Sequence, residues 1–220
     1  MERTRARLAA DLHDDVGSTL SQIAVLAEVL RSEVPESDSL RQEPLQRMAR
    51  ISREAVDAMG DMVWAINPAR DHLGDLRHRI SRYAAETLPE AGVDVELPGP
   101  AGDDEDALDT DVKRETYLVA KEALHNVVKH AHASRAVLEL TVDAGELVLS
   151  VTDDGRGFDA GDANDGNGLA SMRRRGERIG GSLAVASAKG KGTTVTLRVP
   201  RRRPRLPTRF GGMRPRGTRD

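Results

Sequence analysis

The 220-residue sequence contains no cysteine, which excludes disulfide scaffolds, thiolate zinc sites and cysteine nucleophiles. Aromatic residues are scarce, with two Phe, two Tyr and one Trp, so a surface that binds nucleic acid by base stacking is poorly supplied. No apolar run approaches the roughly 18 residues that span a bilayer, and no signal peptide follows Met1. We therefore expect a soluble, cytoplasmic globular chain.

The net charge of −3 is unevenly distributed along the chain. Residues 201–220 carry eight Arg and one Asp, so this Arg/Pro/Gly-rich tail is basic and residues 1–200 are acidic. We expect the tail to be disordered. Its Arg side chains could contact nucleic-acid phosphates without specificity, but most such tails are simply solvated.

Residues 1–70 are expected to form a helical hairpin. Apolar residues from Leu8 to Leu30 recur at every third or fourth position, which is the helical period. A second stripe predicts a helix that starts near Pro44 and ends before Asn67. The stripes are too long for the two helices to bury alone. A second copy would complete a dimeric four-helix bundle, which we favour, and packing against the rest of the same chain is the alternative.

Residues 71–200 have the pattern of an α+β domain. Expected strands cover 93–97, 136–142, 147–152, 182–187 and 193–199. Expected helices cover 72–90, 108–131 and 169–179. The strands would form one mostly antiparallel sheet with helices on one face.

A glycine-rich loop follows the expected strand at 147–152. Asp153 stands before Gly155 and Gly157, where glycine lets the backbone approach a ligand, and its carboxylate could accept a hydrogen bond from an adenine amine. Gly166 and Gly168 then lead into a helix whose N-terminus favours phosphate. Taken alone, such loops are more often plain turns, and no Walker motif is present.

The helix at 108–131 carries polar groups on one face. Asn126 lies four residues after Glu122, and Lys129 and His130 lie three and four residues after Asn126, which places these groups on neighbouring positions of one helical face. Carboxylate and amide oxygens suit a hydrated magnesium ion, and the cations suit phosphate. A solvated charged face is the alternative. The opposite face is expected to pack in the core: Tyr117, Ala120, Leu124, Val127 and Val128.

His13 lies beside the apolar stripe of the first helix, on its shoulder rather than in its seam. Asp14 follows directly and could orient one ring nitrogen, which makes the other the better nucleophile. A lone exposed histidine on a helix usually has no such role.

Together these segments closely resemble the catalytic core of bacterial sensor histidine kinases that partner NarL/LuxR-type response regulators. Residues 3–20 resemble the H box, residues 122–130 the N box, residues 153–157 the G1 box and residues 166–169 the G2 box, with Gly192-Thr193 as the closing element. Residues 64–68, Trp-Ala-Ile-Asn-Pro, are a further marker of the resemblance. The similarity covers residues 2–200 in the family's order.

The resemblance implies a dimerisation and phosphotransfer hairpin (1–70), a Bergerat-type ATP-binding domain of α/β-sandwich form (71–200) and a tail (201–220). It implies that His13 is the phosphoacceptor and Asp14 its proton acceptor. It further implies that Asn126 holds magnesium with Glu122 as polar or basic support nearby. The remaining implied contacts are to ATP: Lys129 and His130 to phosphates, Asp153 with Gly155 and Gly157 to adenine, Gly166, Gly168 and Leu169 at a lid, and Thr193 in support of Asp153.

The implied function is autophosphorylation of His13 from Mg-ATP and transfer to an aspartate of a response regulator with receiver and helix-turn-helix domains. The alternative is a Bergerat-fold regulatory protein without histidine chemistry, such as an anti-sigma-type serine kinase or an inactive adaptor. Ser18 replaces a Gln that supports phosphatase activity in many relatives, so weak phosphatase activity is expected. No sensor domain precedes the H box, so we expect a truncated core or a separate sensor protein.

Overall fold

The computed structural model describes residues 16–35, 37–66, 71–97, 99, 104–159 and 167–201. His13, Asp14 and Gly166, together with the tail after residue 201, lie outside the described residues. The predictions made for them therefore rest on the sequence. Among the described residues, none of the helices is both long and apolar enough to cross a membrane.

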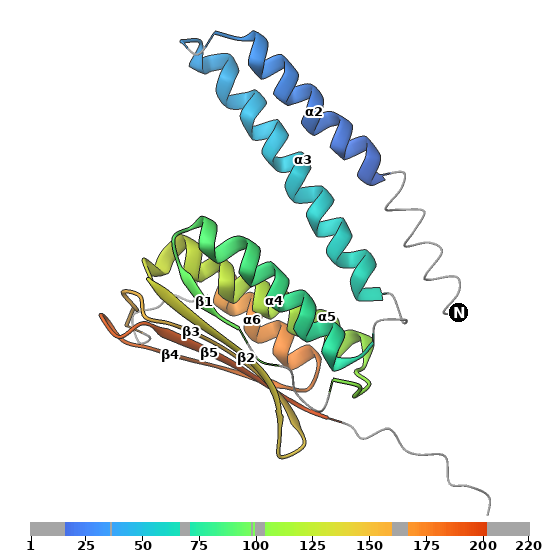
Figure 1. Ribbon diagram of the computed structural model, residues 1–220, viewed down its shortest axis with the longest axis vertical. Coiled ribbons are helices and arrows are strands. Elements are labelled where there is room, and N and C mark those ends of the chain that lie inside the picture. Colours follow the sequence, from blue (N-terminus) through green and yellow to red (C-terminus); the bar gives the residue numbers. More distant parts are fainter. Residues whose placement is uncertain are drawn as a thin grey trace, which may run out of the picture.

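The two N-terminal helices form an antiparallel hairpin, α2 (Ser18–Glu33) and α3 (Ser39–Ile66) (Figure 1). The residues buried in the hairpin are small: Ala24, Ala27, Ala49 and Ser52. The large apolar side chains of the predicted stripes point elsewhere, since Leu26, Leu30 and Ile51 remain 61%, 51% and 48% exposed. The hairpin therefore uses a seam of small residues internally and leaves several of its large apolar residues exposed within the described chain.

Helix α3 begins five residues before Pro44, and not near it as the sequence suggested. The carbonyl oxygen of Asp38 accepts hydrogen bonds from the backbone of Arg41 and Gln42, which starts the helix at Ser39. Gln42 also donates from Nε2 to the carbonyl oxygens of Arg31 and Val34, at 3.1 and 2.7 Å, and so ties the start of α3 to the end of α2. These contacts outweigh the single helical hydrogen bond that Pro44 cannot donate.

The second domain is the predicted α+β layer, in which one face of a sheet is covered by helices (Figure 1). Its helices are α4 (Leu73–Glu90), α5 (Thr110–Asn126) and α6 (Asn167–Arg178). Its strands are β1 (Asp94–Glu96), β2 (Arg135–Asp143), β3 (Glu146–Asp153), β4 (Ser182–Ser187) and β5 (Thr193–Pro200). The strand order is β1-β2-β3-β5-β4, and only the β1–β2 pair is parallel.

Alternating burial along the strands forms the core beneath α4, α5 and α6. Leu147, Leu149 and Val151 of β3 are at most 2% exposed, whereas the residues between them are only partly buried. This period of two is the pattern expected of a sheet with one covered face. The fold class predicted from the sequence is confirmed.

Helix α5 starts with a side-chain cap and ends in an unusual turn. The Asp109 carboxylate accepts from the Asp111 backbone N–H at 2.9 Å, as an N-cap residue does. The helix then widens into a π-helical turn, Val127–Ala131. This turn changes the helical period, so Val128 is 36% exposed instead of packing in the core with Val127. The prediction that Val128 belongs to the apolar face is therefore wrong.

Candidate functional site

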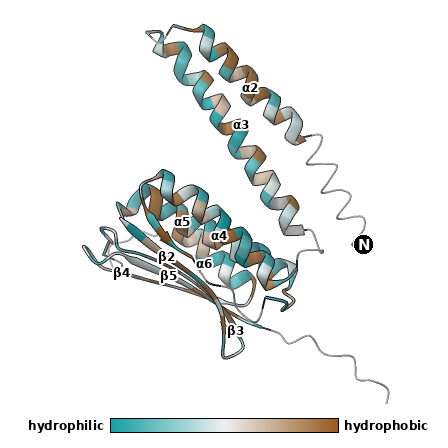
Figure 2. Ribbon diagram, in the orientation of Figure 1, coloured by the Kyte–Doolittle hydropathy of each residue, from teal (hydrophilic) through white to brown (hydrophobic). Residues whose placement is uncertain are grey.

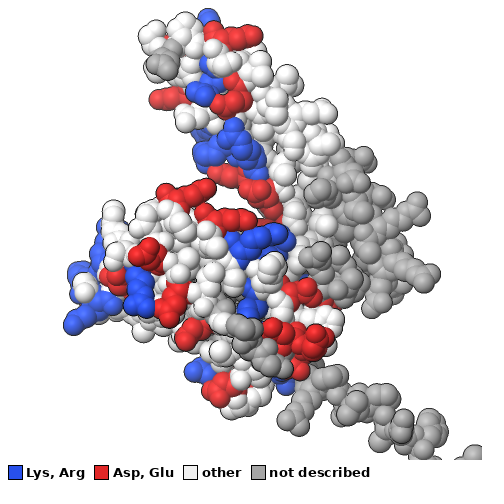
Figure 3. All heavy atoms as spheres, viewed as in Figure 1, with Lys and Arg blue, Asp and Glu red and all other residues white. Residues whose placement is uncertain are grey.

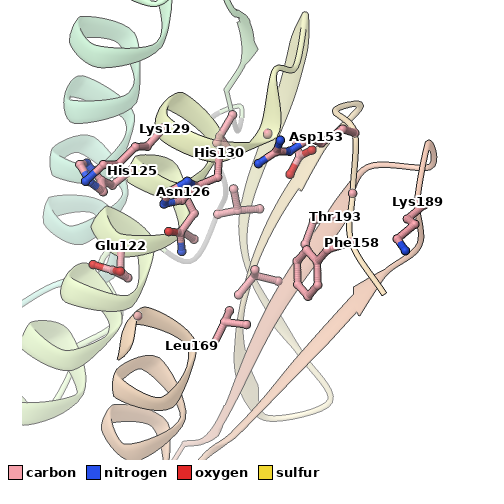
Figure 4. A pocket seen from close by; sticks show the side chains of 18 of the residues that line it. Glu122, His125, Asn126, Lys129, His130, Asp153, Phe158, Leu169, Lys189 and Thr193 are labelled. Atoms are coloured by element: carbon pink, nitrogen blue, oxygen red, sulfur yellow. The ribbon is translucent and has the colours of Figure 1, made fainter. Parts of the chain in front are cut away.

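A cavity of about 630 Å³ opens between the C-terminal half of α5, the π-helical turn, the ends of β3 and β5, and the N-terminus of α6 (Figure 4). Its base is apolar, with Ala123, Val151 and Val195 among the lining residues. Its polar lining residues include the cations Lys129, Arg156 and Lys189, the imidazole of His130, and the carboxylates of Glu122 and Asp159. An apolar cleft with a charged rim suits a planar base at depth and an anionic group at the mouth.

Asp153 is the buried carboxylate of this cavity. It ends β3, is 7% exposed, and lies opposite Thr193 in the β3–β5 register. Its Oδ1 accepts the backbone N–H of Gly155 at 2.9 Å. Burial raises the pKa of Asp153, the backbone hydrogen bonds from Gly155 and Thr193 oppose this, and the neighbouring charge of Asp154 adds to it. The net pKa is raised, and Asp153 lines the cavity.

Three glycines allow the backbone segments around Asp153 to touch. A Cβ on Gly192 would lie 1.9 Å from the Asp153 carbonyl oxygen, and the residue has a φ of +75°. A Cβ on Gly157, whose φ is +55°, would lie 2.1 Å from the carbonyl oxygen of Ala188. Gly155 packs against the π-helical turn, where an added Cβ would lie 2.4 Å from the Ala131 carbonyl oxygen. These positions require glycine because any side chain would push the walls of the cavity apart.

Glu122 and Asn126 lie one turn apart on α5, and the side chains of both face the first residues of α6 (Figure 4). A Cβ on Gly168 would come within 2.3 Å of Glu122 Oε1 and 3.8 Å of Asn126 Nδ2. Lys129 and His130 follow in the π-helical turn, a local widening that is frequent at functional sites. The carboxylate, the amide and the two basic groups therefore meet at one end of the cavity.

These donors fit a magnesium ion that is held only partly by protein. The described residues contain no group of three or more His, Asp or Glu side chains that could form a metal cage. Magnesium takes oxygen ligands, retains several waters and is commonly bound by one or two protein groups together with phosphate oxygens. Asn126, with Glu122 beside it, provides that kind of donor set.

The structure brings most of the predicted site residues together. The cavity lining includes these nine: Glu122, Asn126, Lys129, His130, Asp153, Gly157, Gly168, Leu169 and Thr193. Gly155 lies behind Asp153 as its hydrogen-bond donor rather than in the lining. The cavity is also lined by His125, Arg156, Phe158 and Lys189, which were not predicted as site residues from the sequence. Arg156 and Phe158 stand beside glycines of the G1 box, and this proximity was the available signal for them.

Comparison with known proteins first defines the class of the second domain. A family model described as "Histidine kinase-, DNA gyrase B-, and HSP90-like ATPase" matches residues 111–203. The histidine kinase domain of a blue-light activated histidine kinase from Erythrobacter litoralis has a similar fold, with a TM-score of 0.52 at 22% identity over 83% of this chain and 95% of that one. Full-length ShkA, solved in complex with AMPPNP, gives a TM-score of 0.53 at 16% identity over 88% of this chain and 45% of that one. The domain is therefore an ATPase fold of this class.

The hairpin narrows the class to a family. A second family model, described as "Histidine kinase", matches residues 4–71. Sensor histidine kinase LiaS of Bacillus subtilis is 29% identical over 89% of this chain and 54% of its own length. The histidine-protein kinase/phosphatase UhpB of Salmonella typhimurium is 29% identical over 91% of this chain and 39% of its own length. The chain belongs to the histidine kinases, and it spans about half or less of the length of these relatives.

Proposed function

We propose that this chain is the catalytic core of a two-component system, which phosphorylates His13 from Mg-ATP and passes the phosphoryl group to a response regulator. The observation that carries the proposal is the cavity in which a buried carboxylate, Asp153, lies at one end and Glu122, Asn126 and the basic π-helical turn lie at the other. Its chemistry suits adenine at the first end and phosphates at the second. The similar ShkA structure was solved with AMPPNP, an ATP analogue, and so supports the same nucleotide.

Each side chain then has a defined task. Asp153 accepts the adenine amine, with Thr193 and the nearby glycines shaping the base site, while Lys129 and His130 bind phosphate oxygens. Gly168 and Leu169 border the lid at the start of α6, with Gly166 as its other hinge. Magnesium, held by Asn126 and supported by Glu122, would neutralise phosphate charge. Such positioning and charge neutralisation are the main needs of phosphoryl transfer.

The transfer step needs few protein groups. A ring nitrogen of His13 attacks the γ-phosphorus, the bond from that phosphorus to the β–γ bridging oxygen breaks, and ADP leaves. Asp14 accepts the proton from the other ring nitrogen and so keeps the attacking nitrogen nucleophilic. The phosphohistidine then passes its phosphoryl group to an aspartate of a response regulator with receiver and helix-turn-helix domains.

Labelled ATP tests the proposal directly. Incubation with γ-labelled ATP should give an acid-labile, base-stable phosphoprotein, and the label should be absent from His13→Gln. Asn126→Asp serves as a second variant, because it should lose label without any change at His13. Label that survives His13→Gln would favour the alternative, a serine kinase or adaptor with the same nucleotide fold.

We also propose that the chain dimerises through the large apolar residues on the outside of the hairpin. Val25 and Leu26 of α2 are more than 60% exposed, and apolar residues recur along that helix (Figure 2). Such a stripe is typical of helices that pack in a four-helix bundle. Leu26→Asp should weaken dimerisation at least ten-fold in analytical ultracentrifugation, whereas Ser32→Asp on the same helix should not. A dimer unaffected by Leu26→Asp would contradict this assignment.

Weak phosphatase activity follows from Ser18, the first residue of α2. Its hydroxyl is shorter than the Gln amide of many relatives and cannot place a water molecule in the same way. Dephosphorylation of the phospho-regulator in the presence of ADP should be slow and should become faster in Ser18→Gln. Wild-type turnover as fast as that of a Gln-bearing relative would refute this expectation.

A further inference from the structure

The last turn of α3 packs in the core of the ATP-binding domain and not in the hairpin. Trp64 is 6% exposed and belongs to the same buried cluster as the residues of α4, α5 and the sheet. Its ring lies 5.3 Å from the Tyr117 ring, centroid to centroid. Two cations flank it, with Arg79 Cζ and Lys113 Nζ each 4.8 Å from the ring centroid. Lys113 is fully buried and donates to the Trp64 carbonyl oxygen at 3.3 Å.

Asp61 lies one turn before Trp64, and its carboxylate accepts three charge-assisted hydrogen bonds from α4 and α5. Its Oδ1 accepts from Arg79 Nη2 and from the Tyr117 hydroxyl, both at 2.8 Å. Its Oδ2 accepts from Lys121 Nζ at 2.6 Å. Burial raises the pKa of Asp61, but these three donors outweigh it and the net pKa is lowered. Lys121 directly precedes Glu122, so Asp61 bonds to the part of α5 that lines the nucleotide cavity.

Gly60 stands immediately before this anchored turn. A Cβ added to Gly60 would meet nothing within 4 Å, so neither packing nor a close backbone contact requires a glycine there. Glycine in a helix interior weakens the helix and lets the backbone bend. The buried residues of α3 farther upstream, Ala49 and Ser52, lie within the hairpin. In Figure 3 an open gap separates the hairpin from the ATP-binding domain, and the two join at the end of α3.

We infer that Asp61 and Trp64 are positioning residues that fasten the end of α3 to α5, and that the hairpin and the ATP-binding domain move relative to each other by bending of α3 at Gly60. The point at which the two domains bend relative to each other then lies within α3, before Asp61. Asp71, which follows the segment 67–70, supports this position because its Oδ1 accepts from Lys113 Nζ at 2.6 Å. Both flanks of the segment are thus bound to the same buried lysine.

The contacts of Asp61 and Trp64 also have a role in catalysis, and this part of the inference rests on the proposed function. Transfer requires His13 and the γ-phosphate of bound ATP to meet, and holding reactants within reach contributes strongly to rate. The start of α2 lies beside this part of α3, since a Cβ added to Gly17 would be 3.0 Å from Met59 Cε. While Asp61 is bound to α4 and α5, bending at Gly60 moves the nucleotide cavity along a restricted path past the start of α2. Without the hydrogen bonds of Asp61, the cavity samples many positions from which the γ-phosphate cannot reach His13.

Spin labels test the mechanical part independently of any activity. The chain has no native cysteine, so Arg47→Cys on α3 and Glu139→Cys on β2 give two unique sites, both exposed. Labelled chain mixed with excess unlabelled chain limits the measurement to distances within one chain. Asp61→Asn should broaden the distance distribution at least two-fold, and Gly60→Ala should narrow it. Distributions unchanged in both variants would overturn the inference.

Kinetics test the catalytic part. Asp61→Asn should lower the rate of His13 labelling at saturating ATP at least ten-fold while the dissociation constant for ATP stays within two-fold. Lys121→Met, which removes one of the three donors, should lower the rate less, and Asp57→Asn, an exposed carboxylate one turn upstream, should leave it unchanged. If wild type does not label His13, the proposed function fails while the spin-label result still decides the anchor. If wild type labels and Asp61→Asn labels equally fast, the positioning role is refuted.

Discussion

Gly155→Ala is the sharpest test of how the nucleotide cavity is built. The added Cβ would lie 2.4 Å from the Ala131 carbonyl oxygen and 2.8 Å from the Ala131 Cβ, whereas ordinary contacts begin near 3.4 Å. The loop must therefore move away from the π-helical turn by about 1 Å. That movement breaks the hydrogen bond from the Arg156 backbone N–H to the same carbonyl oxygen, now 2.7 Å long. Overpacking costs about 1–3 kcal/mol and the lost hydrogen bond about 1 kcal/mol, so we expect about 2–4 kcal/mol of destabilisation.

The same movement shifts Asp153, whose carboxylate accepts from the Gly155 backbone N–H. We therefore expect ATP affinity, measured by isothermal titration calorimetry, to fall at least ten-fold while urea denaturation reports the stability loss. Gly180→Ala is the control: its φ is +70° and an added Cβ meets nothing within 4 Å, so it should cost about 1–2 kcal/mol without weakening ATP binding. Wild-type ATP affinity in Gly155→Ala would refute the role given to this contact.

Three further outcomes follow from buried charges. Lys113→Met leaves the Asp71 carboxylate without its 2.6 Å partner and should lower the free energy of unfolding by about 3 kcal/mol; a loss below about 1 kcal/mol in urea denaturation would contradict this. Glu115→Gln removes the carboxylate that accepts from Arg175 Nη1 at 2.9 Å and joins α5 to α6, so ATP should bind several-fold more weakly with the rate at saturating ATP unchanged; unaltered affinity would count against the α5–α6 link. Burial raises the pKa of Asp153, so the folded protein retains a proton that the unfolded chain releases near pH 3.9. The free energy of unfolding of nucleotide-free protein should therefore fall as the pH rises from about 3.9 through the higher pKa of the folded state. Asp153→Asn should remove this fall, and an unchanged pH profile would contradict the assignment.

Periodicity and glycine placement made much of the molecule predictable. The sequence pattern predicted β4 with its observed bounds, and β2, β3 and β5 to within a residue at each end. The Asp153 loop and the Glu122–Asn126 spacing gave the two ends of the cavity. Features that arise from contacts between distant segments were missed. The π-helical turn, which exposes Val128, depends on the packing of Ala131 against Gly155 and cannot be read from helix propensity.

The contacts that hold the end of α3 against α5 could not be predicted either, because they also join segments that are distant in the sequence. The sequence marks Trp64 only as part of a recurring motif, and Asp61 is one more charged residue on a helix. The partners of Asp61 come from 18 to 60 residues further along the chain. No local pattern distinguishes such a carboxylate from the exposed ones beside it. Lys113, fully buried next to Trp64, is likewise indistinguishable by sequence from a solvated lysine.

The seam of small residues between α2 and α3 has a consequence for how the protein responds to its own concentration. Three alanines and a serine bury little apolar surface, so the hairpin gains little folding free energy from its internal contact. In the proposed dimer its exposed apolar residues gain theirs against a second copy, and a folded state stabilised by association follows mass action. Dilution should then loosen the helices of the hairpin while the ATP-binding domain stays folded. In the proposed kinase, the amount of protein in the cell would thereby set what fraction of it has an ordered hairpin.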